Sequence, residues 1–165
     1  MVDLSGAEST ADISPCGLYR YSLTRRWADG ATALFVMLNP STADASKDDP
    51  TIRRCISFAK REGCGALEVV NLYSFRATDP KDLTRTVHSP NGVASNGAIL
   101  SAAARASIVI AAWGGWIPKA WDVRPREVIH MIDRPAYALG VTSNGQPRHP
   151  LYVRADAPLR LYEAP

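Results

Sequence analysis

The sequence predicts an α/β fold, a three-layer α/β/α sandwich with a mostly parallel central sheet. Three short runs of aliphatic and aromatic residues, at 31–38, 66–71 and 106–113, are typical of strands buried on both faces. Two segments with helical character, 51–62 and 93–105, separate these runs. Strands that alternate with helices indicate a parallel or mixed sheet covered on both sides. A chain of 165 residues is long enough for one such domain.

The first predicted elements depend on where polar residues and prolines interrupt the chain. Residues 1–15 are small and polar, so we expect them to be disordered or loosely attached and to leave a single domain at 16–165. Residues 18–23 predict a short strand at an edge of the sheet. The next strand has to end at Asn39, because Pro40 lacks a backbone N–H and fixes its own φ.

The helix predicted at 51–62 carries signals at both ends. Asp49 is a good N-cap, Pro50 suits the first helical position, and Gly63 favours a stop. The remaining predicted strands lie at 66–71, 106–113 and 136–141. The remaining predicted helices are one at 93–105 and one from about 116 that is interrupted or ends near Pro125. The loop at 72–92 is long, and loops of this length in a compact domain are usually functional.

Composition and charge are those of an ordinary soluble globular protein, with 46% hydrophobic and 21% charged residues. The net charge of +3 is compatible with a nucleic-acid or phosphate partner but does not require one. No run approaches the roughly 18 apolar residues of a membrane span, and residues 1–12 lack an export signal, so we expect neither membrane attachment nor export. Three cysteines without Cys-x-x-Cys spacing favour a reduced, cytoplasmic protein that holds no metal or other cofactor.

Four polar loops are predicted where strands end, and they contain the candidate functional residues. They are the segments 39–42, 71–76, 113–116 and 148–152. In a doubly wound sheet, the ends of strands of the same polarity gather along one rim, and ligands bind in the crevice beyond that rim. We therefore expect these four loops to meet in one cleft.

The longest motifs of the chain resemble those of a family of uncharacterised bacterial and phage proteins. The motifs are MLNPSTA at 37–43, DPT at 49–51, NLY at 71–73, RATDP at 76–80 and GQPRHPLY at 145–152. The resemblance covers nearly the whole chain from Tyr19 to Leu161. It implies no established activity.

The order of the four loops is also similar to that of the uracil-DNA glycosylase superfamily. In that superfamily a strand ends in Asp-Pro or Asn-Pro, the next major strand ends in an Asn that recognises the base, a later strand ends in Leu-Trp-Gly, and a His-Pro-Ser-Pro loop follows. The matching positions here are Asn39-Pro40, Asn71, Trp113-Gly114 and His149-Pro150. This resemblance implies a uracil-DNA-glycosylase-like fold and cleavage of the bond between a base and its sugar.

The resemblance also implies a role for individual side chains. Asn39 would hold the attacking water through its amide oxygen, and Asn71 would pair with the Watson–Crick edge of the base. His149 would donate a hydrogen bond to the carbonyl on which negative charge collects. Leu151 and Tyr152 would form the wedge that fills the space left by a base taken out of the stack.

The chain departs from the superfamily pattern in four respects. Asn39 carries no charge to stabilise a cationic sugar, the histidine loop lacks its second proline, and there is no cysteine quartet for an iron–sulfur cluster. Ser41 stands where a bulky aromatic residue would exclude substituents at the pyrimidine 5-position. A small residue there favours a 5-substituted or otherwise modified pyrimidine.

Four further residues are candidate ligand contacts. Arg76 and Arg148 are phosphate or base contacts, and Asp44 shares a loop with Asn39 and is a candidate for binding a water or metal. Gly114, followed by a second glycine, allows the backbone to approach an anion closely. The candidates at the strand ends also have structural interpretations. Asn39-Pro40 could form a turn, Asn71 could end a strand, His149 could make a structural hydrogen bond, and Trp113 could pack in the core.

Two functions remain open from the sequence. The first is a hydrolase that acts on the N-glycosidic bond of a pyrimidine, in DNA or in a nucleoside. The alternative is a non-catalytic module of the same fold that binds a nucleotide or a modified base. A hydrolase with a serine or cysteine nucleophile is less favoured, because the sequence has no Gly-x-Ser-x-Gly motif.

Overall fold

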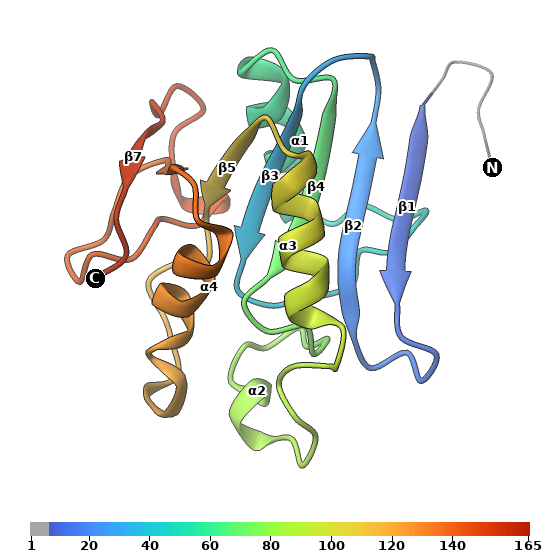
Figure 1. The fold of residues 1–165 in the computed structure, drawn as a ribbon, viewed down its shortest axis with the longest axis vertical. Coiled ribbons are helices and arrows are strands. Elements are labelled where there is room, and N and C mark those ends of the chain that lie inside the picture. The colour runs from blue at the N-terminus through green and yellow to red at the C-terminus, as the bar shows by residue number, and fades with distance from the viewer. Residues whose placement is uncertain (1–6) are drawn as a thin grey trace.

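The computed structural model describes residues 7–165 as an α/β fold built on one seven-stranded mixed sheet (Figure 1). The strands are β1 (Glu8–Ile13), β2 (Arg20–Arg26), β3 (Thr32–Met37), β4 (Ala66–Asn71), β5 (Ile108–Ala111), β6 (Ala136–Ala138) and β7 (Arg160–Tyr162). The helices are α1 (Pro50–Arg61), α2 (Asp82–Arg85), α3 (Ser95–Arg105) and α4 (Arg124–Ile132), with 3-10 turns η1 (Lys119–Trp121) and η2 (Pro150–Tyr152). None of these helices, within residues 7–165, has the length and apolar character that crossing a membrane requires.

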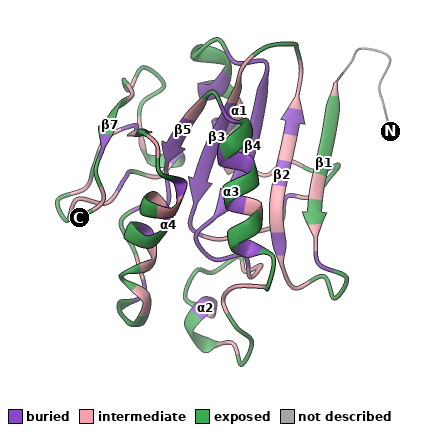
Figure 2. Ribbon diagram, viewed as in Figure 1, coloured by how far each residue is buried: buried purple, intermediate pink, exposed green. Residues whose placement is uncertain are grey.

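The sheet has the strand order β1-β2-β4-β3-β5-β6-β7. Its four central strands, β4, β3, β5 and β6, are parallel, whereas β1 and β2 on one side and β7 on the other are antiparallel to their neighbours. The prediction of a mostly parallel sheet is confirmed only in part, because three of the six strand pairs are parallel and three are antiparallel. The apolar runs identify only the buried central strands. The strands outside them are more polar, and Figure 2 shows that β1 and β2 are less buried than β3 and β4.

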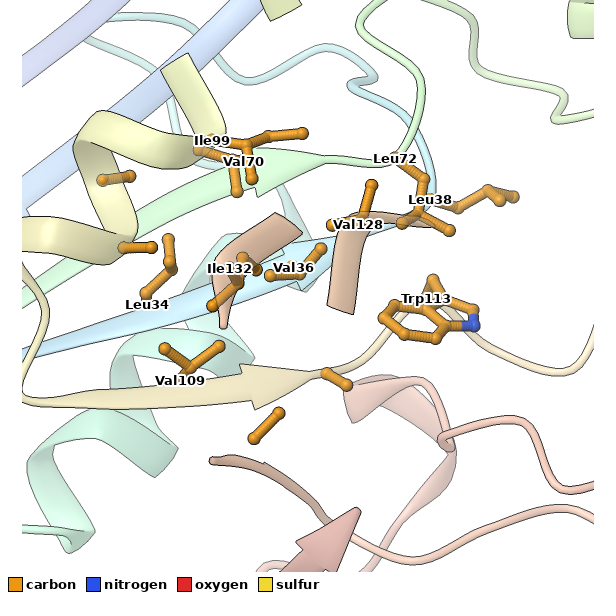
Figure 3. Packing of buried hydrophobic residues seen from close by; sticks show 14 of the residues in the cluster. Leu34, Val36, Leu38, Val70, Leu72, Ile99, Val109, Trp113, Val128 and Ile132 are labelled. Atoms are coloured by element: carbon orange, nitrogen blue, oxygen red, sulfur yellow. The ribbon is translucent and has the colours of Figure 1, made fainter. Parts of the chain in front are cut away.

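Helices cover both faces of the sheet and make the three predicted layers. In Figure 1, α3 and α4 lie on the near face, and α1 lies behind. Successive residues of β3 point to opposite faces, so Leu34 and Val36 pack towards α3 and α4, and Phe35 packs towards α1. The buried residues therefore form two hydrophobic cores, one on each face of the sheet. Figure 3 shows the core under α3 and α4, in which Ile99, Val128 and Ile132 from the helices contact the sheet.

The start of α1 follows the predicted capping pattern. Asp49 has an extended backbone, and its Oδ1 accepts a hydrogen bond from the N–H of Ile52 at 2.9 Å. Pro50 is the first helical residue. The side chain of Asp49 therefore holds the N-terminus of α1 in place at the end of the loop that leaves β3.

Several expectations for individual elements differ from the structure. Part of the segment predicted to be disordered forms β1, which makes β2 an internal strand, while residues 1–6 lie outside the described residues. The helix expected from about residue 116 is absent, because Pro118 and the two glycines before it leave only η1 there. Pro125 instead lies in the first turn of α4, where a proline costs no helical hydrogen bond. The strand β7 carries too few apolar residues to be recognised.

The order of the central strands locates the crevice of the sheet. The chain passes from β3 through α1 to β4 on one side, and then through α3 back past β3 to β5 on the other side. In the parallel ladders, Met37 is paired with Asn71 and Val36 with Ala111, so the three strands end at the same edge. A crevice forms beyond the carboxyl ends of strands at such a change of direction.

Candidate functional site

A cleft of about 740 Å³ opens beyond the carboxyl ends of β4, β3 and β5. This volume lies within the roughly 300–1,000 Å³ that is typical of small-molecule sites. The four loops expected to meet at this edge all contribute to the wall of the cleft, together with the N-terminus of α1. The candidate residues that line it are Asn39, Ser41, Asn71, Trp113, Gly114, Arg148, His149, Leu151 and Tyr152.

Asn39 presents an amide whose orientation is fixed by the backbone around it. Its Nδ2 donates to the carbonyl of Ala77 at 2.8 Å and to that of Pro40 at 3.1 Å. The amide of Ala77 in turn donates to the carbonyl of Pro40, which joins the loop after β3 to the loop after β4. The donor end of Asn39 is therefore occupied, and its Oδ1, which bonds no described residue, remains as an acceptor.

Asn71 is the last residue of β4, and its side chain is 2% exposed. Neither its Nδ2 nor its Oδ1 has a hydrogen-bond partner among the described residues. A buried polar group without a partner costs about 1–3 kcal/mol, and native proteins contain few of them. Asn71 therefore offers one donor and one acceptor side by side in the wall of the cleft.

His149 stands at the start of η2, half-buried. Its Nδ1 accepts a hydrogen bond from the N–H of Leu151 at 3.2 Å, so the neutral ring carries its proton on Nε2. Burial lowers the pKa of His149 below its usual value, against an opposing effect of the Asp49 carboxylate. At neutral pH the residue is therefore an uncharged imidazole that donates through Nε2.

The loop that carries His149 is held from two sides. Arg54 of α1 donates to the carbonyl of Pro150 at 3.2 Å and to that of Val153 at 2.6 Å. On the other side, the N–H of Gly114 donates to the carbonyl of Pro147 at 2.9 Å. Gly114 has a φ of +88°, and a Cβ built on it would lie 3.5 Å from the Cβ of His149. Glycine is therefore favoured here for its backbone conformation, whereas the space beside His149 would admit a Cβ in ordinary van der Waals contact.

Aromatic residues form another part of the wall and the rim. Trp113 is buried, donates through Nε1 to Oε1 of Gln146 at 2.7 Å, and packs edge-on against Tyr162 of β7. Trp116, by contrast, is 41% exposed in the same wall. Tyr152 is 79% exposed at the rim, and its ring lies 5.6 Å from that of His149. Trp113 thus has the packing role considered for it, and it also contacts the cleft.

Two residues proposed as ligand contacts do not line the cleft. The Asp44 carboxylate turns back on its own loop and accepts from the N–H groups of Ser46 and Lys47, at 2.9 and 2.8 Å. Arg76 lies beside a second, smaller cavity, and its Nη1 donates to the carbonyl of Gly17 at 3.3 Å. Both side chains are used for loop structure, which their sequence neighbourhood does not reveal.

Two charged residues of the cleft were missed from the sequence. Arg20, the first residue of β2, is 2% exposed, and burial lowers its pKa to about 10 against the opposing effect of Asp49. Asp49 had been assigned to helix capping, which it performs, yet it also lines the cleft. Among the described residues it is the one carboxylate that does so. The sequence holds no local signal for Arg20, because its place depends on β2 pairing antiparallel with β4 and so beginning at the edge where β4 ends.

No group of three or more His, Cys, Asp or Glu side chains in residues 7–165 is arranged to hold a metal ion. Cys55, on the buried side of α1, is enclosed by the core, and burial raises the pKa of its thiol. The chemical groups that line the cleft include amides, an imidazole, two guanidinium groups and one carboxylate.

Comparison with known proteins gives one match. A family model described as "Protein of unknown function (DUF1643)" matches residues 20–151. No curated protein and no solved structure matches the chain. The matched segment begins at β2 and ends in η2, so it contains three of the four loops that form the cleft and the fourth as far as Leu151.

Proposed function

The chain belongs to the family described as "Protein of unknown function (DUF1643)", and from its cleft we propose that it binds a pyrimidine and hydrolyses the bond between that base and its sugar. The observation that carries the proposal is the meeting of Asn39, Asn71 and His149 at one cleft. These residues are far apart in the sequence, and they correspond to the motif order of the uracil-DNA glycosylase superfamily, whose fold we propose for the chain as well.

Asn71 is suited to recognise the base. A pyrimidine presents a ring N–H or nitrogen next to a carbonyl or amino group along its Watson–Crick edge. An amide whose Nδ2 and Oδ1 are both unpartnered matches two adjacent groups of that edge. Binding would restore the hydrogen bonds that the buried amide lacks, so the gain on binding includes the removal of an existing cost.

Asn39 and His149 are suited to the hydrolytic step. Water held by Oδ1 of Asn39 attacks the sugar carbon, the carbon–nitrogen bond to the base breaks, and the base leaves with the bonding electrons. The proton that the water loses passes to solvent, and the base anion takes up a proton from solvent. Nε2–H of His149 donates to the carbonyl oxygen on which that negative charge collects. A preorganised donor of this kind contributes about 3–4 kcal/mol to lowering the barrier. The lowered pKa of His149 keeps the ring neutral, so it donates a hydrogen bond without adding a positive charge.

The proposed ligand is a modified pyrimidine in DNA or in a nucleoside. Ser41 lines the cleft with a small side chain, which leaves space for a substituent at the 5-position. Leu151 and Tyr152 are exposed at the rim, where a wedge would meet the neighbouring bases of a strand.

A release assay tests the proposal. Oligonucleotides, single- and double-stranded, and free nucleosides carrying uracil, thymine and larger 5-substituted pyrimidines are incubated with the protein, and free base and abasic sites are measured. We expect release that is lost in Asn39→Ala and His149→Ala. The matched controls are Asn96→Ala and His88→Ala, two exposed residues outside the cleft, which should keep it. Release that survives both cleft substitutions would contradict the assigned roles.

A binding module without catalysis is the second candidate, and one observation favours it. Asn39 is uncharged, and the cation in the same wall, Arg20, would oppose the positive charge that develops on the sugar. In that case the protein would bind a pyrimidine nucleotide or modified base with no base release, and Asn39→Ala would leave the affinity unchanged while Asn71→Ala would lower it.

A further inference from the structure

Arg20 is a buried cation in the wall of the cleft, and no residue in the described part of the chain pairs with it as a counter-ion. Its Nη1 donates to the carbonyl of Ala43 at 2.9 Å, and its Nε has no hydrogen-bond partner within residues 7–165. It makes no ion pair with any described residue. Arg25, on the same strand, is buried to a similar degree but has Asp48 at 2.8 Å. A buried charge is costly unless it is paired, so Arg20 differs from a structural arginine.

The charges around Arg20 also favour an anion. The carboxylate of Asp49 favours the charged form of Arg20, but its Oδ1 already accepts the capping hydrogen bond of α1. The positive charges of Arg76 and Arg25 act against it. The charged residues that line the cleft are Arg20, Arg148 and Asp49, which leaves one positive charge in excess when His149 is neutral.

Arg20 is placed to meet a group attached to the bound ring. Its backbone N–H donates to the carbonyl of Ser74, three residues beyond Asn71, so β2 begins next to the end of β4. The bond from Nη1 to Ala43 holds its guanidinium against the loop that contains Ser41. A substituent extending from a ring held by Asn71 towards Ser41 would approach this cation.

We propose that Arg20 binds an anionic oxygen of the ligand, so that the natural ligand is a negatively charged pyrimidine compound. The charge is either a carboxylate on the base or a phosphate on the sugar, because both present oxygens that a guanidinium binds well. The pyrimidine ring in this statement rests on the proposed function, whereas the anion is argued from Arg20 itself. A hydrogen bond to a charged group contributes about 1.5–3 kcal/mol, which is a change in affinity of about 10- to 100-fold.

Calorimetric titration with two matched pairs of ligands tests the proposal. The first pair is 2′-deoxyuridine 5′-monophosphate and 2′-deoxyuridine, and the second is 5-carboxyuracil and thymine. We expect the anionic member of at least one pair to bind at least about tenfold more tightly. The first pair identifies a phosphate and the second a carboxylate. Equal affinity within both pairs would overturn the proposal.

Variants of Arg20 assign the preference to the guanidinium. Arg20→Met should abolish the preference for the anion, and Arg20→Lys should retain part of it, because the charge remains without the planar fork. Arg53→Met, an exposed arginine of α1 outside the cleft, removes the same net charge and should leave the preference intact. A preference that persists in Arg20→Met would also overturn the proposal.

Two further results keep the test decisive. If Arg20 only supports the Ala43 carbonyl, Arg20→Met lowers the midpoint of thermal unfolding and leaves ligand selectivity unchanged. If Arg20→Met does not fold, the two ligand pairs measured on the unmodified protein still decide. Purine nucleotides that bind through Arg20 as tightly as pyrimidine nucleotides would retain the anion site and overturn the proposed function instead.

Discussion

Replacing Asn71 by leucine tests whether its unpartnered amide destabilises the fold and whether the same amide is needed for ligand binding. The side chain is 2% exposed, and neither of its polar atoms has a partner among the described residues. Apolar side chains, including Met37, Val69 and Ile52, line the same cleft. Each buried, unsatisfied polar atom costs about 1–3 kcal/mol, and imperfect repacking of a leucine costs less than about 1.5 kcal/mol. Because Asn71 has two such atoms, removing them should recover about 2–6 kcal/mol against the cost of repacking, so Asn71→Leu should raise the free energy of unfolding by at least about 0.5 kcal/mol.

Urea denaturation measures this change directly, and for a domain of this size each kcal/mol also shifts the thermal midpoint by roughly 2–4 °C. The matched control is Asn91→Leu. The Oδ1 of Asn91 accepts from the backbone N–H of Ser74 and from the hydroxyl of Ser95, both at 3.2 Å, so this substitution should cost about 1–3 kcal/mol. The reasoning is refuted if Asn71→Leu destabilises the protein as much as Asn91→Leu does. The same Asn71→Leu variant should no longer bind 2′-deoxyuridine.

Three further predictions follow from the cleft. Asn39→Asp should lower the free energy of unfolding by about 1–3 kcal/mol in urea, because carboxylate oxygens would replace the N–H groups that face the carbonyls of Pro40 and Ala77; a neutral effect would show that these bonds are not made. Burial lowers the pKa of His149, so the unfolded chain takes up a proton near pH 6.5 before the folded protein does, and stability should fall as the pH drops below that value. Urea denaturation between pH 5 and 8 should reveal this fall in stability, and His149→Gln should remove the part of the fall that His149 causes. Gly114→Ala should lower the free energy of unfolding in urea by about 1–2 kcal/mol, because φ is +88° there and alanine is strained in that conformation.

The parts of the site that follow from local sequence were predictable. Asn39, Asn71 and Trp113 each follow a short apolar run, and the parallel pairing of β3 with β4 and β5 brings these strand ends to one edge. Asp49 and Pro50 predicted the start of α1 because capping depends on nearby residues. Such signals lie within a few positions of the feature that they determine.

The rest depends on contacts between distant segments. The apolar runs could not reveal that β2 pairs antiparallel with β4, and therefore could not place Arg20 in the cleft. Arg76 lies five residues beyond Asn71, yet the loop directs it to Gly17 instead. A proline such as Pro125 can mark either the end of one helix or the first turn of the next. The packing of Val128 and Ile132 in the core shows that the helix lies after Pro125.

Because Trp113 and Trp116 both line the cleft, the protein carries its own optical reporter of occupancy. A ligand that displaces water from the exposed indole of Trp116 should shift the fluorescence emission of that indole to shorter wavelength. The other two tryptophans, Trp27 beside Lys60 and Trp121 beside Tyr73, supply a constant background. Compound collections can therefore be screened by fluorescence without labelling, and Trp116→Phe identifies signals that arise elsewhere.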